Sequence, residues 1–209
     1  MEELKAFIGV LIASGRCNSS KLSVKNMWNT NPLFNQPFYS AAISRDRFLL
    51  IFRTLRFDDT STRQTRFNLS KDKFEPIREV FETINACFRQ NYSPLIHLTV
   101  DERMVGFRDR CPFRVYIKSK PARYGLKLWV CADVKTSYIL NIQPYTGKIC
   151  GVKESRQGER VVKELVSTYF GSGHGVTADN FSTSVPLALY LLKKNISEWK
   201  FKEKLYLYT

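Results

Sequence analysis

Two aspartates follow short apolar segments that we expect to be β-strands, and a carboxylate at a strand end can ligate a metal ion. Asp101 follows residues 95–100, and Asp179 follows residues 176–178. Hard cations such as Mg²⁺ prefer oxygen ligands, and a pair of them about 4 Å apart commonly catalyses phosphodiester cleavage. An acid at such a position can equally cap a helix, and we expect a helix from Ser184. Taken alone, these residues leave both interpretations open.

Positive charge is concentrated just after Asp101. The 209 residues include 33 Lys and Arg against 19 Asp and Glu, a net charge of +14. In a folded domain such an excess favours a polyanionic partner, usually nucleic acid, although a merely solvated basic surface is the alternative. Within 103–127, a single acid, Asp109, faces eight basic residues. These are Arg103, Arg108, Arg110, Arg114, Lys118, Lys120, Arg123 and Lys127. The segment could hold a phosphate backbone beside the carboxylates.

Other classes of protein are disfavoured by the cysteines and by the amino-terminal residues. The five cysteines are odd in number and form no Cys-x2-Cys pair, so we expect reduced thiols, not a zinc finger or a disulfide framework. The start MEELKAFIGVLIASG is acidic, and its apolar run is too short to span a bilayer. We therefore expect a cytosolic or nuclear protein with no membrane partner.

The elements that must position the two aspartates can be predicted from periodicity. Apolar residues at helical spacing predict three helices, followed after Pro94 by the order β–β–β–α–β–α. The predicted helices cover 2–15, 44–55, 73–91, 158–170 and 184–194; the predicted strands cover 95–100, 126–134, 138–145 and 176–178, with 114–117 as a further short strand. Residues 58–70 are polar and are expected to form a loop. In this order the first and fourth strands can be neighbours in a sheet, so that both aspartates would face one cleft.

The segments around these residues resemble piggyBac-type transposases. The motifs are TVDERMVGFRDRCPFRVYIKSKPARYGLKLWVCAD at 99–133, YTGK at 145–148 and VTADNFSTSVPLA at 176–188. The similarity extends upstream through LKAFIGVLIASG and ISRDRFLLIFRTLRFDD, and it covers nearly all of residues 1–196.

The resemblance implies a mixed α+β or α/β fold. A helical dimerisation and DNA-binding domain, residues 1–93, would precede an incomplete ribonuclease H-like mixed sheet with flanking helices, residues 94–196. Residues 197–209 are then a divergent tail.

The resemblance also implies a function, namely cut-and-paste DNA transposition through three aspartates and Mg²⁺ or Mn²⁺. Asp101 matches the first catalytic, metal-binding aspartate and Asp179 matches the second. The implied partner is double-stranded DNA of transposon ends, bound by a homodimer in the nucleus. The basic residues expected to contact DNA are Arg108, Arg110, Arg114, Lys118, Lys120 and Arg123.

The sequence departs from the family pattern after Asn195. No residue matches the third catalytic aspartate, because Glu198 and Glu203 lie in the wrong context. We therefore expect weak metal binding and no catalysis by this chain alone, and whether it is an enzyme stays open. The alternatives are a DNA-binding or dimerisation module without catalysis and a non-functional remnant. Asp133 matches no catalytic position and is expected to be a surface or turn residue.

Overall fold

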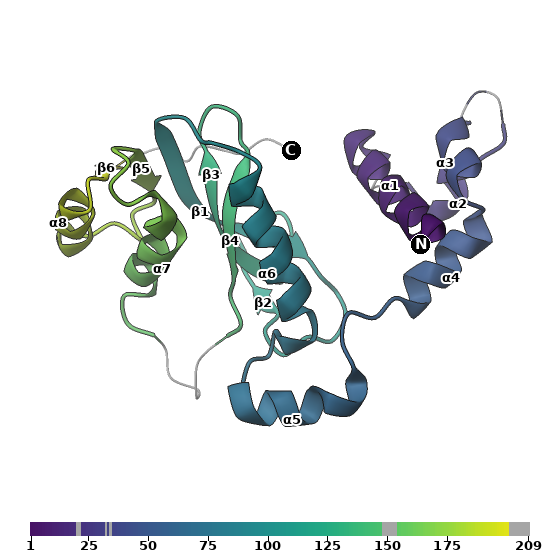
Figure 1. Ribbon diagram of the computed structural model, residues 1–209, viewed down its shortest axis with the longest axis horizontal. Coiled ribbons are helices and arrows are strands. Elements are labelled where there is room, and N and C mark those ends of the chain that lie inside the picture. Colours follow the sequence, from purple (N-terminus) through teal and green to yellow (C-terminus); the bar gives the residue numbers. More distant parts are fainter. Residues whose placement is uncertain (20–21, 32, 34, 148–153, 201–209) are drawn as a thin grey trace. The chain divides into compact units, whose positions relative to one another are not determined.

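The computed structural model describes residues 1–19, 22–31, 33, 35–147 and 154–200. The chain forms two compact units, Met1–Phe57 and Asp58–Thr209 (Figure 1). The units divide earlier than the predicted domains, because the helix predicted at 73–91 packs on the sheet of the second unit. None of the described helices is long and apolar enough to cross a membrane.

The first unit is helical, as predicted. Its helices are α1 (Glu2–Arg16), α2 (Val24–Met27), α3 (Pro37–Ala42) and α4 (Arg45–Thr54). Ser44 caps α4, since its side chain accepts a hydrogen bond from the backbone N–H of Arg47. The helices enclose a small aromatic core in which the rings of Phe7 and Phe48 lie 5.0 Å apart.

In its described residues, 58–147 and 154–200, the second unit adds four helices and six strands. They are α5 (Thr60–Ser70), α6 (Glu75–Gln90), β1 (His97–Gly106), β2 (Val115–Tyr116), β3 (Tyr124–Asp133), β4 (Ile139–Pro144), α7 (Gln157–Val166), β5 (Gly175–Ala178), α8 (Val185–Lys193) and β6 (Ser197–Lys200). A 3-10 turn at Ser167–Tyr169 follows α7. The prediction of a loop over 58–70 was wrong, because these residues form α5.

Helix α5 has no buried residue and is held by its ends and its charges. Asp59 accepts a hydrogen bond from the N–H of Ser61 at the start of the helix. Arg63 and Arg66 both reach the carboxylate of Asp58, at 2.7 and 3.0 Å. A helix without an apolar face gives no periodic signal, which explains why the sequence pattern indicated a loop.

The strands form one mixed sheet in the order β2–β3–β1–β5–β6, and β4 pairs with β3 as well. β1 runs antiparallel to β3 and parallel to β5, and β5 runs parallel to β6. The sequence predicted that the first and fourth strands would be neighbours in the sheet. The pairing of β1 with β5 confirms this prediction. β6 lies in the segment that was predicted to be a divergent tail.

The main core lies between this sheet and the helices α7 and α8. The apolar face of α7 (Val161, Val162, Leu165 and Val166) is fully or almost fully buried against strand residues such as Leu98 and Val176. Helix α6 runs alongside the edge strand β4 (Figure 1). Its buried Asn85 accepts a hydrogen bond from the N–H of Ile142 and donates to the Ile142 carbonyl. The packing of α7 on Leu98 and Val176 holds β1 and β5, the strands that position the candidate site.

Candidate functional site

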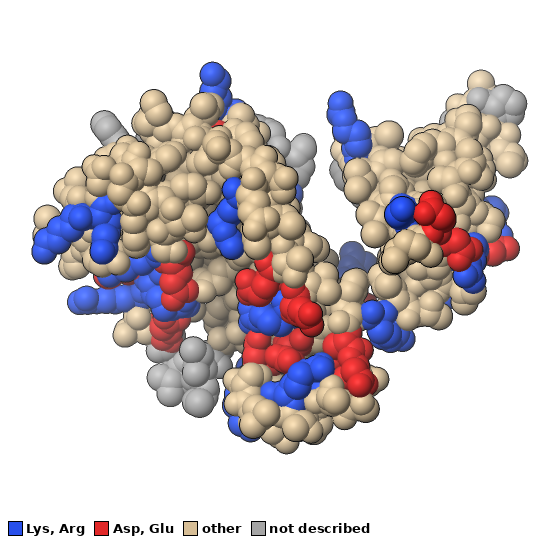
Figure 2. Space-filling view, viewed as in Figure 1, with Lys and Arg blue, Asp and Glu red and all other residues tan. Residues whose placement is uncertain are grey.

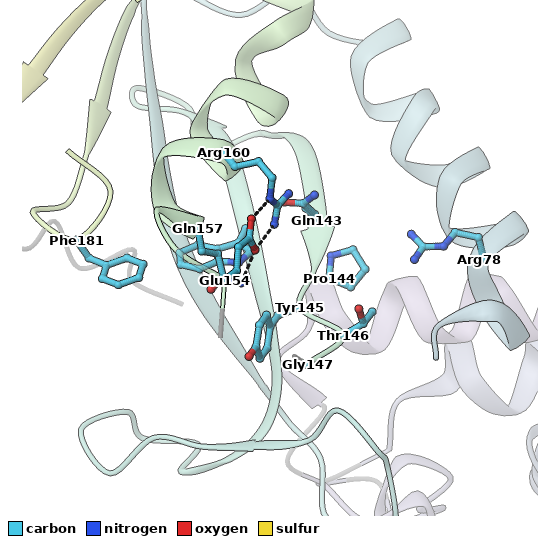
Figure 3. A pocket seen from close by; sticks show the side chains of 11 residues that line it. Arg78, Gln143, Pro144, Tyr145, Thr146, Gly147, Glu154, Gln157, Arg160 and Phe181 are labelled. Carbon is cyan, nitrogen blue, oxygen red and sulfur yellow. Dashed lines mark hydrogen bonds and ion pairs between the residues drawn. The ribbon is translucent and has the colours of Figure 1, made fainter. Parts of the chain in front are cut away.

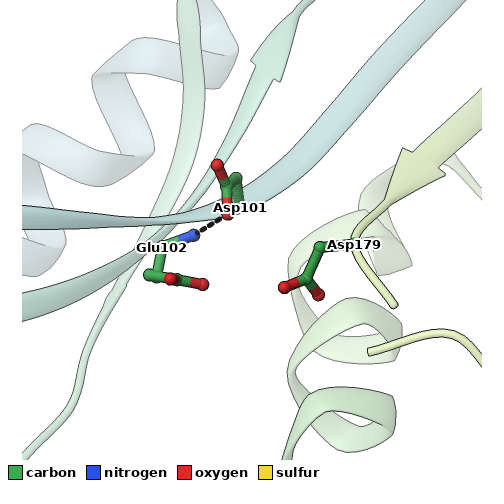
Figure 4. A group of neighbouring side chains, drawn as sticks. All are labelled: Asp101, Glu102 and Asp179. Carbon is green, nitrogen blue, oxygen red and sulfur yellow. Dashed lines mark hydrogen bonds between the residues drawn. The ribbon is translucent and has the colours of Figure 1, made fainter. Parts of the chain in front are cut away.

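The parallel pairing of β1 with β5 brings Asp101 and Asp179 together. The register aligns Leu98 with Val176 and Val100 with Ala178, and each aspartate is the next residue along its chain. The prediction that the strand ends before Asp101 was wrong, because β1 continues to Gly106 and only its pairing with β5 stops at Val100. Asp101 therefore lies within β1, Asp179 follows the end of β5, and their carboxylates lie near one another (Figure 4). The structure thus brings together the two acids that the sequence had singled out.

A third carboxylate, that of Glu102, completes the group. Asp101, Glu102 and Asp179 each offer a carboxylate oxygen, and these oxygens all lie within 4.8 Å of one another (Figure 4). Sequence reasoning missed Glu102, because neighbouring residues of a strand normally point to opposite faces of the sheet. Asp101 lies just past the last residue of β1 that is paired with β5, where both side chains can approach the same space.

Hydrogen bonds hold the two aspartates in place. The N–H of Glu102 donates to Oδ1 of Asp101 at 2.7 Å. On the other strand, the N–H of Ser182 donates to Oδ1 of Asp179 at 3.1 Å, and the N–H of Thr183 donates to the Asp179 carbonyl. Helix α8 is capped by Ser184, whose Oγ accepts from the N–H of Leu187. Asp179 therefore closes the turn and is not the cap of α8.

The negative charges of the three carboxylates repel one another. Burial raises the pKa of the Asp101 carboxyl, and the negative charges of Glu102 and Asp179 raise it further. The ammonium of Lys120 lies 3.1 Å from Oε1 of Glu102 and offsets part of this repulsion. Lys127 also interacts electrostatically with Glu102, Asp179 and Asp101, so that three acids face two basic groups. The remaining negative charge favours a bound cation.

The geometry fits a hard divalent cation. In an octahedral Mg²⁺ site with metal–oxygen distances near 2 Å, ligand oxygens lie about 3 Å apart when adjacent and about 4 Å apart when opposite. The spacing of the oxygens of Asp101, Glu102 and Asp179, within 4.8 Å, requires only small side-chain adjustments to reach these values. The donor set is all oxygen, which suits Mg²⁺ or Mn²⁺ and not a softer metal.

The predicted DNA-contacting residues lie in three kinds of surroundings. Arg108, Arg110, Lys118 and Arg123 are exposed and, among the described residues, make no ion pair within 4.0 Å. Lys120 is instead half-buried and is paired with Glu102. Arg114 is exposed, but its guanidinium donates to the carbonyls of Arg108 and Asp109, so that it also shapes the loop that carries them.

Some basic residues elsewhere in the second unit are neutralised by acidic side chains. Figure 2 shows acidic and basic side chains intermixed on the face where α5, α6 and α7 lie. Arg78 is paired with Asp72 and Glu82, and Arg160 is paired with Glu154 and Glu164. The unpaired positive charge of the second unit therefore includes much of the segment that follows β1.

Asp133 has a structural role. Its side chain is completely buried, so the predicted surface position was wrong and the predicted turn position is confirmed. The carboxylate accepts hydrogen bonds from the N–H groups of Leu95, Lys135 and Thr136 and from the hydroxyl of Tyr92. It fixes the turn between β3 and β4 and does not belong to the acidic group.

The sheet order and the flanking helices define a ribonuclease H-like fold, and the comparisons with known proteins place the chain among transposases. A protein-family model described as "Transposase IS4" matches residues 1–198. The chain belongs to this transposase family, and its relatives are of the piggyBac type.

Two human proteins and one solved structure are similar to the chain. PiggyBac transposable element-derived protein 3 is 29% identical over 192 residues, covering 88% of this chain and 31% of the relative. PiggyBac transposable element-derived protein 2 is 28% identical over 202 residues, covering 93% and 32%. The cryo-EM structure of a piggyBac transposase synaptic complex with hairpin DNA superposes with a TM-score of 0.83 and 35% identity, covering 99% of this chain and 43% of that one. The chain thus spans about a third of the curated relatives' length.

Proposed function

We propose that Asp101 and Asp179 are the first two catalytic aspartates of a transposase site and that they ligate Mg²⁺ or Mn²⁺ for DNA cleavage and strand transfer. The observation that carries the proposal is the parallel pairing of β1 with β5, which brings both carboxylates together just beyond its last paired residues, Val100 and Ala178. The similarity of the surrounding motifs to piggyBac-type transposases supports the same assignment.

The chemistry assigns a different task to each residue. A bound divalent cation would stabilise the attacking and leaving oxygens of the phosphodiester. Asp101 and Asp179 would hold it, since their backbone contacts fix the direction of both carboxylates. Glu102 lies close enough to serve as a further ligand, and Lys120 balances its charge until a cation arrives.

The proposed substrate is double-stranded DNA. The structure with the TM-score of 0.83 is that of a transposase in a synaptic complex with hairpin DNA. In this chain, Arg108, Arg110 and Lys118 are exposed and lie in the segment that follows β1, where their charges could contact phosphates. By the same family likeness we propose a homodimer that acts in the nucleus.

A DNA-binding module without catalysis is the second candidate function. It is favoured by the exposed basic residues Arg108, Arg110 and Lys118, which could bind phosphates whether or not the DNA is cut. Two or three carboxylates on one edge can hold a cation weakly, whereas two-metal catalysis normally needs a fuller ligand set. On this account the 209 residues bind DNA and a cation but do not cut DNA unaided.

Binding to a short DNA duplex, measured by fluorescence anisotropy in EDTA and in Ca²⁺ or Mn²⁺, tests the proposal. We expect the divalent cation to tighten binding several-fold in the wild type, because it bridges carboxylate and phosphate. Asp101→Ala and Asp179→Ala should lose this gain and should bind more tightly than the wild type in EDTA, because each removes a negative charge near the DNA. Equal responses of all three proteins would overturn the assignment of the two aspartates.

Nicking of the same duplex in Mn²⁺ separates the two candidate functions. No nicking by the wild type agrees with a binding module. Nicking that each substitution abolishes would show that the chain cuts DNA and requires both aspartates.

A further inference from the structure

Arg114 differs from the other exposed arginines of the basic segment in what its guanidinium binds. Its Nη1 donates to the carbonyl of Arg108 at 2.7 Å and to that of Asp109 at 3.2 Å. Arg114 is exposed, and within the described residues no carboxylate lies within 4.0 Å of it. A charged donor makes stronger hydrogen bonds than a neutral one, so these two bonds hold the backbone of the loop 107–114 in one conformation.

An aromatic ring supports the same guanidinium. Cζ of Arg114 lies over the ring of Tyr124 in β3, 5.6 Å from its centroid. Tyr116, the cross-strand partner of Tyr124, packs on it with 4.7 Å between the ring centroids. Both tyrosines are more than half exposed, so this contact lies at the surface beside the loop. A planar guanidinium can donate hydrogen bonds in its plane while it stacks on a ring.

Phe113 anchors the same end of the loop in the interior. It is only 9% exposed, and its ring lies 5.9 Å from that of Phe74, with an angle of 63° between the planes. Arg78 covers Phe74, with its guanidinium 5.0 Å from the ring centroid, and a Cβ at Gly147 would lie 3.9 Å from Cβ of Phe113. Figure 3 shows Arg78 and Gly147 among the residues that line a cavity of about 410 Å³. The loop therefore ends at a fixed point.

The loop also begins at a fixed point, and two free cations lie between its ends. The N–H of Phe107 donates to the carbonyl of Tyr124 at 3.2 Å. Arg108 and Arg110 are exposed and make no ion pair in the described part of the chain. Ordering a flexible loop costs conformational entropy, and a loop that is already held loses less of it when a ligand binds.

We propose that Arg114 is a positioning residue: it holds the loop of Arg108 and Arg110 in place for DNA phosphates and does not contact a phosphate itself. The sequence had grouped Arg114 with the residues that contact DNA, and this inference gives it a different task. It rests on the proposed function, because it takes DNA as the ligand.

The test places Arg114→Gln in two backgrounds, the wild type and the double variant Arg108→Gln, Arg110→Gln. Each phosphate contact contributes about −0.9 to the slope of log binding constant against log salt concentration. In the wild type, Arg114→Gln should make the slope shallower by up to about 1.8, because both arginines lose their fixed positions. In the double variant it should leave the slope unchanged, because the residues through which it acts are gone.

Hydrogen exchange of the free protein tests the positioning without DNA. The amides of residues 107–114 should exchange faster in Arg114→Gln, because the loop opens more often. Tyr124→Leu removes the supporting ring but no charge, and should raise exchange in the same residues. Lys118→Gln is the control, since Lys118 is exposed and donates no side-chain hydrogen bond among the described residues. Unchanged exchange in Arg114→Gln, or faster exchange that spreads through β1 and β3, would contradict a local positioning role.

The outcomes distinguish this inference from the proposed function. If the wild type binds DNA but Arg114→Gln leaves its slope unchanged, or removes a further contact of about 0.9 from the double variant, the positioning role is wrong while DNA binding stands. If the wild type does not bind the duplex at all, this inference and the proposed DNA substrate are both wrong.

Discussion

The negative charge of Asp101 is costly in the structure without a cation. Its carboxyl is half-buried, and burial together with Glu102 and Asp179 raises its pKa. Such residues stabilise a bound ligand at the expense of the free protein. A substitution that removes one of these charges should therefore stabilise the protein without a cation and, at the same time, weaken cation binding.

Asp101→Asn tests this opposition. Asparagine keeps an oxygen that can accept from the N–H of Glu102, but it removes the charge. We expect the melting temperature in EDTA to rise by roughly 2–4 °C, since solvent screening keeps the gain near 1 kcal/mol. The extra stabilisation that Mn²⁺ gives the wild type should disappear. A lower melting temperature in EDTA would show that the charge of Asp101 does not destabilise the protein in the absence of a cation.

The raised pKa of Asp101 also predicts how metal affinity depends on pH. Protons and the cation compete for the same carboxylate, and a raised pKa means that protons win at a higher pH than for an ordinary aspartate. Calorimetric titration with Mn²⁺ from pH 8 down to pH 5 should show affinity that already falls above the ordinary aspartate range. An affinity that stays constant down to pH 5 would contradict this electrostatic description.

At the scale of elements, the packing of α7 on the turn after β5 positions Asp179. Gly158 in the first turn of α7 leaves no room for a side chain, because a Cβ would lie 2.7 Å from Cα of Ser182. Helix and turn must therefore keep their present spacing for the two carboxylates to meet.

Gly158→Ala should destabilise the protein by about 1–3 kcal/mol and weaken Mn²⁺ binding, since the turn that carries Asp179 has to shift. Gly9→Ala is the matched control. Nothing lies within 4 Å of a Cβ at Gly9 in α1, so alanine there should stabilise the helix by up to about 1 kcal/mol. Thermal melts with and without Mn²⁺ measure both effects, and equal behaviour of the two variants would refute the role of this contact.

The turn between β3 and β4 depends on Asp133. Burial opposes its charge, but the N–H groups of Leu95, Lys135 and Thr136 outweigh burial and lower its pKa. A lowered pKa in the folded state means that its contribution is present near neutral pH and is lost as the pH falls from the ordinary aspartate range towards the lowered value.

Asp133→Ala should cost about 2 kcal/mol or more at pH 7, because several buried donors lose their acceptor. The difference from wild type should shrink as the pH falls from 5 to 3. Urea unfolding at several pH values measures it. A difference that is independent of pH would mean that the neutral side chain serves the turn equally well.

Particular elements show what the sequence could and could not predict. The helices α1, α4 and α6 and the pair β1 and β5 follow from apolar periodicity, because each buries one face. Helix α5 could not be predicted this way, since its stability comes from Asp58, Arg63 and Arg66. Glu102 was missed for a different reason: its approach to Asp179 depends on where pairing with β5 stops.

At the scale of the whole molecule, the excess of positive charge predicts salt-sensitive DNA binding. The logarithm of the binding constant should fall linearly with the logarithm of salt concentration, with a slope of about −0.9 for each phosphate contact. The exposed residues Arg108, Arg110 and Lys118 are the strongest candidates for such contacts.

Changing Arg108, Arg110 and Lys118 together to glutamine should make the slope shallower by up to about 3. The matched control changes Lys71, Lys193 and Lys194, which are also exposed in the second unit, and removes the same charge. Anisotropy titrations between 50 and 300 mM salt, about the range in which such slopes are resolved, compare them. If both triple variants make the slope shallower by the same amount, the segment after β1 has no special role in DNA binding.

The central claim is that Asp101 and Asp179 form one divalent-cation site, and the most direct measurement is Mn²⁺ binding followed by electron paramagnetic resonance. The free Mn²⁺ signal should fall when wild-type protein is added. It should remain when the protein carries Asp101→Asn and Asp179→Asn, although the double variant stays folded. Undiminished Mn²⁺ binding by the folded double variant would contradict the account.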